Sequence, residues 1–161
     1  MMRSVFTAAD VAMNVQNLPT ASLTRRLAAM LYDAMVILAL YILLGGLLVT
    51  AVSKLQGSDE LLRLSPAMSM TILFSFAFLY YSHSWRRGGQ TIGMKAWRIR
   101  LTTLDAKPVR LSHCMLRTGI GFFSLILGGF GFWWALFDKQ QRSWHDMASL
   151  TRVVFIPKDM Q

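Results

Sequence analysis

Charged residues beside long apolar runs are the part of this chain whose types and spacing could do chemistry. Arg26 and Asp33 are seven residues apart, so both lie on one face of a helix, about 10 Å apart along its axis. Asp33 lies inside an otherwise uncharged apolar run. A carboxylate there costs on the order of 1–3 kcal/mol if it faces lipid, so it should face other helices and bind a donor. The pattern predicts either a cation or proton site, or a structural bond between helices.

The candidate donors for Asp33 are two arginines and two tyrosine hydroxyls. Arg26 lies on the same helix face, and Arg117 stands at the head of the third apolar run. Tyr32 and Tyr80 carry the hydroxyl groups. Arg117 has an alternative role, because an arginine at the end of a membrane helix can extend its charge to the lipid headgroups.

The remaining polar clusters predict no catalysis. His145 and Asp146 are adjacent, so in a helix they point about 100° apart and do not form a catalytic couple by themselves. His83, His113 and Cys114 occur singly, without the spacing of metal ligands. We therefore expect no enzyme activity, no catalytic residue, no metal and no cofactor.

A glycine-rich turn at residues 88–95 contains Gly93. Its G-x-x-x-G spacing lies in a polar segment, so it does not predict a helix-dimer seam. It also lacks the longer pattern of a phosphate-binding loop. The turn is expected to hold the chain at the membrane surface.

Three apolar runs place the chain in a membrane. The 161 residues are 54% hydrophobic and 16% charged, which excludes a disordered chain. A net charge of +9 can indicate nucleic-acid binding, but long uncharged apolar runs argue against it. About 20 apolar residues cross a bilayer, which predicts membrane spans at 27–53, 64–85 and 119–137.

The distribution of charge predicts the orientation. Residues 1–26 hold three basic side chains and one acidic one, residues 84–118 hold eight and one, and residues 54–65 are balanced. Because positive residues stay in the cytoplasm, the N-terminus and residues 84–118 should lie inside. The basic segment should also attract anionic lipid headgroups.

The third run, 119–137, has two possible topologies. It is either one span or, because glycines cluster at 128–131, a re-entrant hairpin that returns the tail to the cytoplasm. Alternating side chains at 97–102 and 152–155 predict two short strands. If these strands pair with each other they share one side of the membrane, although residues 108–111 are a competing partner.

These observations together predict an all-α membrane protein. It has about three transmembrane helices, the third either a full span or a re-entrant hairpin, and a small cytoplasmic strand pair. We expect a mobile N-terminal segment at 1–20, a membrane domain at 21–156 and a tail at 157–161.

Four segments resemble motifs of the RDD family, small membrane proteins of bacteria and archaea named for one arginine and two aspartates. Residues 26–33 match R-x-x-A-x-x-x-D, and residues 89–95 resemble G-Q-T-x-G-K with Met94 inserted before the lysine. The third motif, an arginine before the last apolar run, is matched by Arg117. The fourth is a closing h-D…T-x-V-V signature, which residues 142–146 and 151–154 match.

The resemblance implies that Arg26, Asp33 and Asp146 are the three named residues. Transport of small cations has been proposed for this family, which favours a cation or proton transporter, or a subunit of one, in the bacterial cytoplasmic (inner) membrane. Three short helices enclose little space, so a homo-oligomer or a larger membrane complex is expected. The alternative is a non-enzymatic accessory or assembly factor that packs against such a complex.

Overall fold

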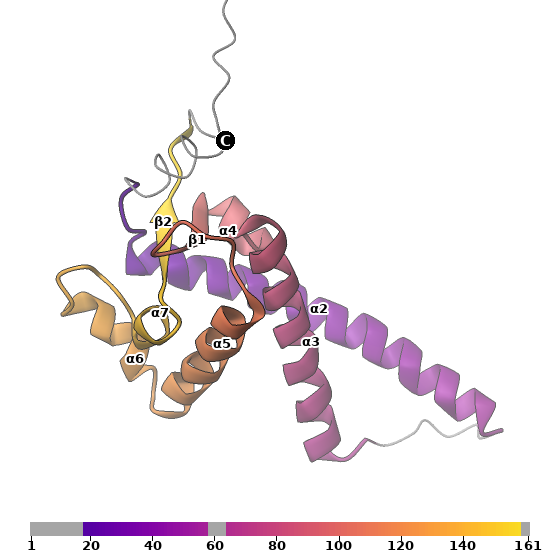
Figure 1. Ribbon diagram of the computed structural model, residues 1–161. Coiled ribbons are helices and arrows are strands. Elements are labelled where there is room, and N and C mark those ends of the chain that lie inside the picture. The colour runs from indigo at the N-terminus through magenta and orange to yellow at the C-terminus, as the bar shows by residue number, and fades with distance from the viewer. Residues whose placement is uncertain (1–17, 58–63, 159–161) are drawn as a thin grey trace, which may run out of the picture.

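The computed structural model describes residues 18–57 and 64–158 of the chain. Helices dominate it, with one pair of short strands (Figure 1). Its elements in chain order are α2 (Leu23–Leu55), α3 (Pro66–Gly88), α4 (Ile92–Ala96), β1 (Ile99–Thr103), α5 (Leu111–Ile126), α6 (Phe130–Trp133), η1 (Trp134–Leu136), α7 (Trp144–Ala148) and β2 (Thr151–Phe155).

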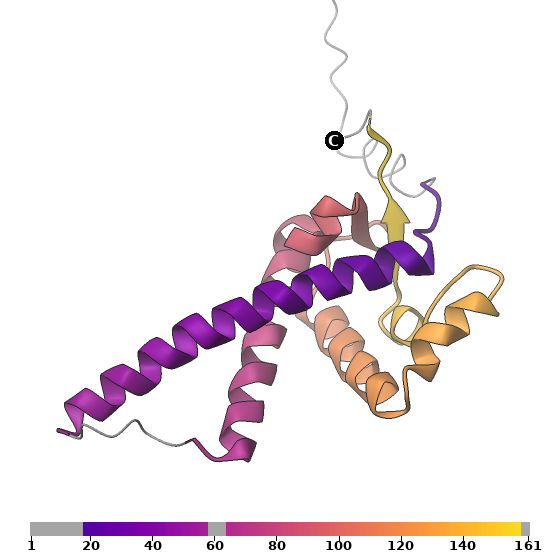
Figure 2. The same cartoon turned by 180° about the vertical axis from the view of Figure 1, so that it is seen from behind.

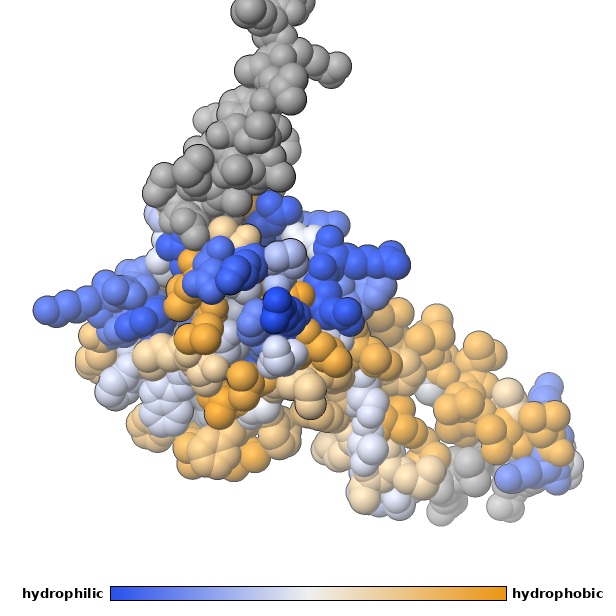
Figure 3. Space-filling view, viewed as in Figure 1, coloured by the Kyte–Doolittle hydropathy of each residue, from blue (hydrophilic) through white to orange (hydrophobic). Residues whose placement is uncertain are grey.

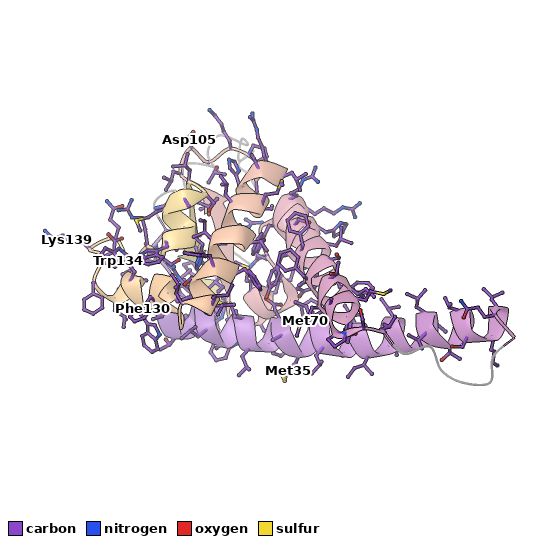
Figure 4. All side chains as sticks on the ribbon, turned by 90° about the horizontal axis from the view of Figure 1, so that it is seen from below. Met35, Met70, Asp105, Phe130, Trp134 and Lys139 are labelled. Atoms are coloured by element: carbon purple, nitrogen blue, oxygen red, sulfur yellow. The ribbon has the colours of Figure 1, made fainter. Side chains whose placement is uncertain are left out.

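The long helix α2 has two different halves. Its N-terminal half packs against the rest of the protein and buries Arg26, Ala29, Asp33 and Ile37. Its C-terminal half extends away from the other helices, as Figures 1 and 2 show from opposite sides. Seen from below, Met35 points away from α3 and α5 (Figure 4). The buried residues therefore follow one face of the first four turns, as the spacing of Arg26 and Asp33 predicts.

Among residues 18–57 and 64–158, length and composition support membrane crossing for α2. They also support it for the bent pair of α5 with the segment Phe130–Leu136, if the pair forms one span. The predicted span 27–53 lies inside α2. The predicted span 64–85 corresponds to α3, which is long enough but less apolar. Figure 3 shows hydrophilic side chains gathered at the end that carries the strands and hydrophobic side chains over the opposite part.

The third apolar run, 119–137, is not one straight helix. α5 ends at Ile126, and the segment Phe130–Leu136 is turned by 110° relative to it. Gly128 and Gly129 occupy the break with φ angles of 69° and 81°, a conformation that residues with a Cβ rarely adopt. The glycine cluster therefore bends the chain, and the two helices form either one broken span or a re-entrant loop.

The two predicted strands pair with each other. β1 and β2 are antiparallel, with Ile99 opposite Phe155 and Thr103 opposite Thr151. Residues 18–21 add to the other edge of β2, because Ala21 N donates to Val153 O and Phe155 N donates to Pro19 O, both at 2.9 Å. The segment expected to be mobile, 1–20, therefore pairs with β2 at its end, and residues 1–17 lie outside the described part.

The hydrophobic core lies where the first half of α2, the end of α3, the strands and the start of α5 meet. Ala29, Trp85, Ile99, Cys114 and Val153 are buried together there. The strand pair brings the end of the chain back to α2 and α5. This return positions the candidate site.

Candidate functional site

The carboxylate of Asp33 is enclosed by three uncharged donors. Tyr80 Oη donates to Oδ1 at 2.7 Å, Gly93 N donates to Oδ1 at 2.8 Å, and Thr91 Oγ1 donates to Oδ2. Asp33 is 1% exposed. Of the donors expected from the sequence, only Tyr80 binds it. Arg26 and Arg117 bind elsewhere, and no hydrogen bond joins Tyr32 to Asp33 in the described part.

The first residues of α4 orient all three donors. Ile92 N donates to Tyr80 Oη at 3.1 Å, and Met94 N donates to Thr91 Oγ1 at 3.1 Å. Each hydroxyl oxygen accepts a hydrogen bond from a backbone N–H, and each hydroxyl group donates a hydrogen bond to the carboxylate. The N–H groups at a helix start lack partners within the helix, so three consecutive ones are used here.

Gly93 allows α4 to lie directly on α2. A Cβ at this position would overlap the carbonyl oxygen of Ala29 and lie 2.9 Å from Asp33 Oδ1. The glycine turn, expected only to hold the chain at the membrane surface, therefore also supplies two donors to the carboxylate, Thr91 and Gly93.

A second cluster joins two arginines to Asp146. Arg26 Nη1 donates to Oδ2 at 2.6 Å, and Arg117 Nη1 donates to Oδ1. All three side chains are less than a tenth exposed. Arg117 Nη1 also donates to Thr151 Oγ1 at 3.0 Å. Arg117 is therefore buried and paired with Asp146, which differs from the alternative in which an exposed arginine extends its charge to the surrounding lipid headgroups.

The short helix α7 presents Asp146 to the arginines. Ser143 precedes the helix, and its N–H and Oγ both donate to Asp146 Oδ2, at 3.1 and 2.7 Å. The bond from Ser143 N to the side chain three residues further on is a capping-box contact, whose S-x-x-D spacing is readable in the sequence. His145 Nε2 lies 2.8 Å from Ser143 Oγ but 3.8 Å from Asp146 Oδ1. Ser143 Oγ therefore lies between the imidazole and the carboxylate, within hydrogen-bond distance of both.

Both clusters line one cavity of about 250 Å3. Arg26, Asp33, Arg117 and His145 contribute to its wall, together with apolar side chains of α2, α3 and α5. The labelled Asp105 and Lys139 lie at the outside of the molecule, away from the helix bundle (Figure 4). No group of three or more His, Cys, Asp or Glu residues that could hold a metal occurs in residues 18–57 and 64–158.

The comparison with protein families decides the identity. The model of the RDD family matches residues 20–149, which is most of the chain. The chain belongs to the RDD family. No curated protein and no solved structure is significantly similar to this RDD protein.

The three residues implied by the resemblance do not share one set of contacts in this RDD protein. Arg26 and Asp146 form an ion pair, whereas Asp33 belongs to the hydroxyl and backbone cluster. The two clusters are neighbours on the wall of the same cavity. Gly93, the remaining predicted site residue, lies in the Asp33 cluster. Thr91 and Thr151 were not predicted as site residues, although each is the threonine of a family motif, G-Q-T-x-G-K and T-x-V-V.

Burial and neighbouring charges set the protonation states of His145 and Asp146 in α7. Burial lowers the pKa of His145 to about 3, and the charge of Arg117 acts in the same direction. Burial alone would raise the pKa of Asp146, but the charges of Arg117 and Arg26 outweigh it and hold that pKa well below its ordinary value. At neutral pH the imidazole is therefore neutral and the carboxylate ionised.

We expect acid to destabilise this RDD protein through His145. The unfolded chain binds a proton at this imidazole near pH 6.5, whereas the folded chain binds it only near pH 3. Between these values protonation favours the unfolded chain, and the free energy of unfolding should fall by up to about 1.4 kcal/mol per pH unit. Below about pH 4, protonation of Asp146 in the unfolded chain adds to the loss.

The measurement is thermal or denaturant unfolding in detergent at a series of pH values. The variant His145→Gln keeps a donor toward Ser143 and removes the titration. Its stability should change much less between pH 6 and pH 4 than that of the natural protein. An equal loss in both proteins over that range would contradict the prediction.

Proposed function

We propose that this RDD protein moves a small cation or a proton across the bacterial cytoplasmic membrane, by itself or as a subunit of a transporter. Asp33 is the titrating group, and no chemical catalysis is involved. One observation carries the proposal. Among the acidic residues in 18–57 and 64–158, only Asp33 forms no ion pair.

The surroundings of Asp33 support a role in ion binding. Its three donors orient and stabilise the carboxylate but carry no charge, so its negative charge is not neutralised by a fixed cation. A buried acidic residue within a membrane helix is a functional candidate for this reason. Its position on the wall of a cavity supports exchange with a mobile cation or proton.

The topology that fits this proposal has the N-terminus and the strand pair in the cytoplasm. Helices α2 and α3 cross the membrane, and α5 with α6 forms a re-entrant loop. The pairing of β1 with β2 supports this return, since paired strands lie on one side. Few helices enclose little space, so the transport pathway lies in a homo-oligomer or in a complex with other membrane proteins.

Flux measurements test the proposal. The full chain is reconstituted into proteoliposomes, and proton movement driven by a sodium or potassium gradient is followed with a pH-sensitive dye. The change Asp33→Asn removes the charge and should reduce flux to that of protein-free vesicles. The change Asp105→Asn removes an exposed carboxylate and should leave flux unchanged.

Stability and flux must be compared in the same variant. Gel filtration and thermal unfolding in detergent identify an Asp33→Asn protein that remains folded. Unchanged flux in that folded variant, or no flux above background in the natural protein with any small cation, would contradict transport through Asp33.

A specific observation favours the second candidate, an accessory or assembly factor. Large apolar side chains in the C-terminal half of α2 remain exposed, among them Leu43 at 68% and Leu47 at 67%. Such a helix is suited to packing against another membrane protein. Crosslinking in native membranes, followed by purification in mild detergent, should recover that partner. Recovery of a lone protomer would contradict this role.

A further inference from the structure

Arg117 carries a buried guanidinium group, and only some of its N–H groups donate hydrogen bonds within the described residues. Its Nη1 donates to Asp146 and Thr151, whereas its Nε–H and Nη2–H groups have no partner among the described residues. Asp146 is shared with Arg26, so two guanidinium groups face one carboxylate. The cluster therefore keeps one excess positive charge and unused donors.

Other unused donors lie on the same cavity wall. Trp85 Nε1 and Thr118 Oγ1 are buried and have no partner in the described part of the chain. Both residues line the cavity with Arg117, whose guanidinium carbon lies 5.4 Å from the Trp85 ring. Buried polar groups without partners are uncommon and call for an explanation such as a bound molecule. N–H and O–H groups beside a guanidinium favour an anion with several acceptor oxygens.

The rest of the cavity wall is apolar and reaches the surface of the helix bundle. Phe74 of α3 and Phe122 of α5 make an edge-to-face contact with centroids 5.5 Å apart. Both, with Leu125, line the cavity and are about half exposed. Asp33 also lines it, but its oxygens accept three hydrogen bonds, and it lies about two helical turns from Arg26. A fitting ligand therefore joins an anionic head to an apolar chain.

We propose that this cavity binds the phosphate group of an anionic phospholipid. Arg117, Trp85 and Thr118 donate to the phosphate oxygens, and the acyl chain lies against Phe74, Phe122 and Leu125. The head lies about 9 Å from the start of α5, at the level of the strand pair. Asp33 lines the same cavity, but no contact of the phospholipid uses its carboxylate, so a binding measurement tests this site separately from transport.

The experiment measures thermal unfolding of the full chain in an uncharged detergent. Phosphatidylglycerol and dodecyl phosphate should each raise the Tm by about 5 °C or more at 100-fold excess over Kd. Inorganic phosphate at the same concentrations should not raise it. A full shift with inorganic phosphate would overturn the lipid as ligand, and no shift with any of the three would overturn the site.

The double variant Trp85→Phe with Thr118→Val tests the location. It removes two donors that have no protein partner, so no hydrogen bond of the folded protein is lost. Affinity for dodecyl phosphate should fall at least about tenfold. The matched control, Trp133→Phe with Thr71→Val, changes residues outside the cavity wall and should bind normally. Equal affinity in the double variant and the natural protein would overturn the assignment.

Discussion

Replacement of Asp146 by asparagine is expected to lower the free energy of unfolding by about 3–5 kcal/mol, the usual effect of removing one partner from a buried ion pair. The carboxylate accepts hydrogen bonds from Arg26, Arg117 and Ser143. An amide offers one acceptor oxygen and no charge, so two buried guanidinium groups would lose their counterion. The effect should be large because the carboxylate connects α2, α5 and α7, which come from distant parts of the chain.

Chemical or thermal unfolding in detergent measures this loss. The matched control is Asp105→Asn, since Asp105 pairs with Lys107 at 3.7 Å and both side chains are mostly exposed. Exposed ion pairs contribute little, so the control should unfold like the natural protein. If Asp146→Asn unfolds like that control, Asp146 does not hold the helices together.

The change Gly93→Ala is expected to destabilise the protein by about 2–4 kcal/mol. The added methyl group would overlap the carbonyl oxygen of Ala29 and crowd the carboxylate of Asp33. Because the first of these atoms is backbone, α4 must move away from α2. That movement lengthens the hydrogen bond from Gly93 N to Asp33, which is 2.8 Å in the structure.

Gly119→Ala is a control variant for which we expect a higher free energy of unfolding instead of a lower one. Gly119 lies within α5, and a Cβ there would meet nothing within 4 Å. Alanine in a helix restricts the unfolded chain, so this variant should be more stable by about 0.4–1 kcal/mol. The same unfolding assay compares both changes. A Gly93→Ala protein as stable as the Gly119→Ala protein would show that α4 does not need close contact with α2.

Asp33 shows how far local reasoning extends. Its place in an apolar run requires a partner, and the helical period puts it on the same face as Arg26. Both expectations hold, since the two residues are buried on one side of α2. The identity of the partners cannot be predicted from the sequence, because Tyr80, Thr91 and Gly93 contact the carboxylate only when α4 packs on α2.

The sequence by itself determined the membrane class, the RDD family and the two strands. Apolar run length, motif order and alternation are local properties that need no knowledge of where the chain returns. Only the tertiary structure decided that Arg26 and Arg117 bind Asp146 instead of Asp33, and that residues 119–137 bend. The physical reason is the long-range pairing of β1 with β2, which brings α7 back beside α2 and α5. No helical period relates residues 120 positions apart.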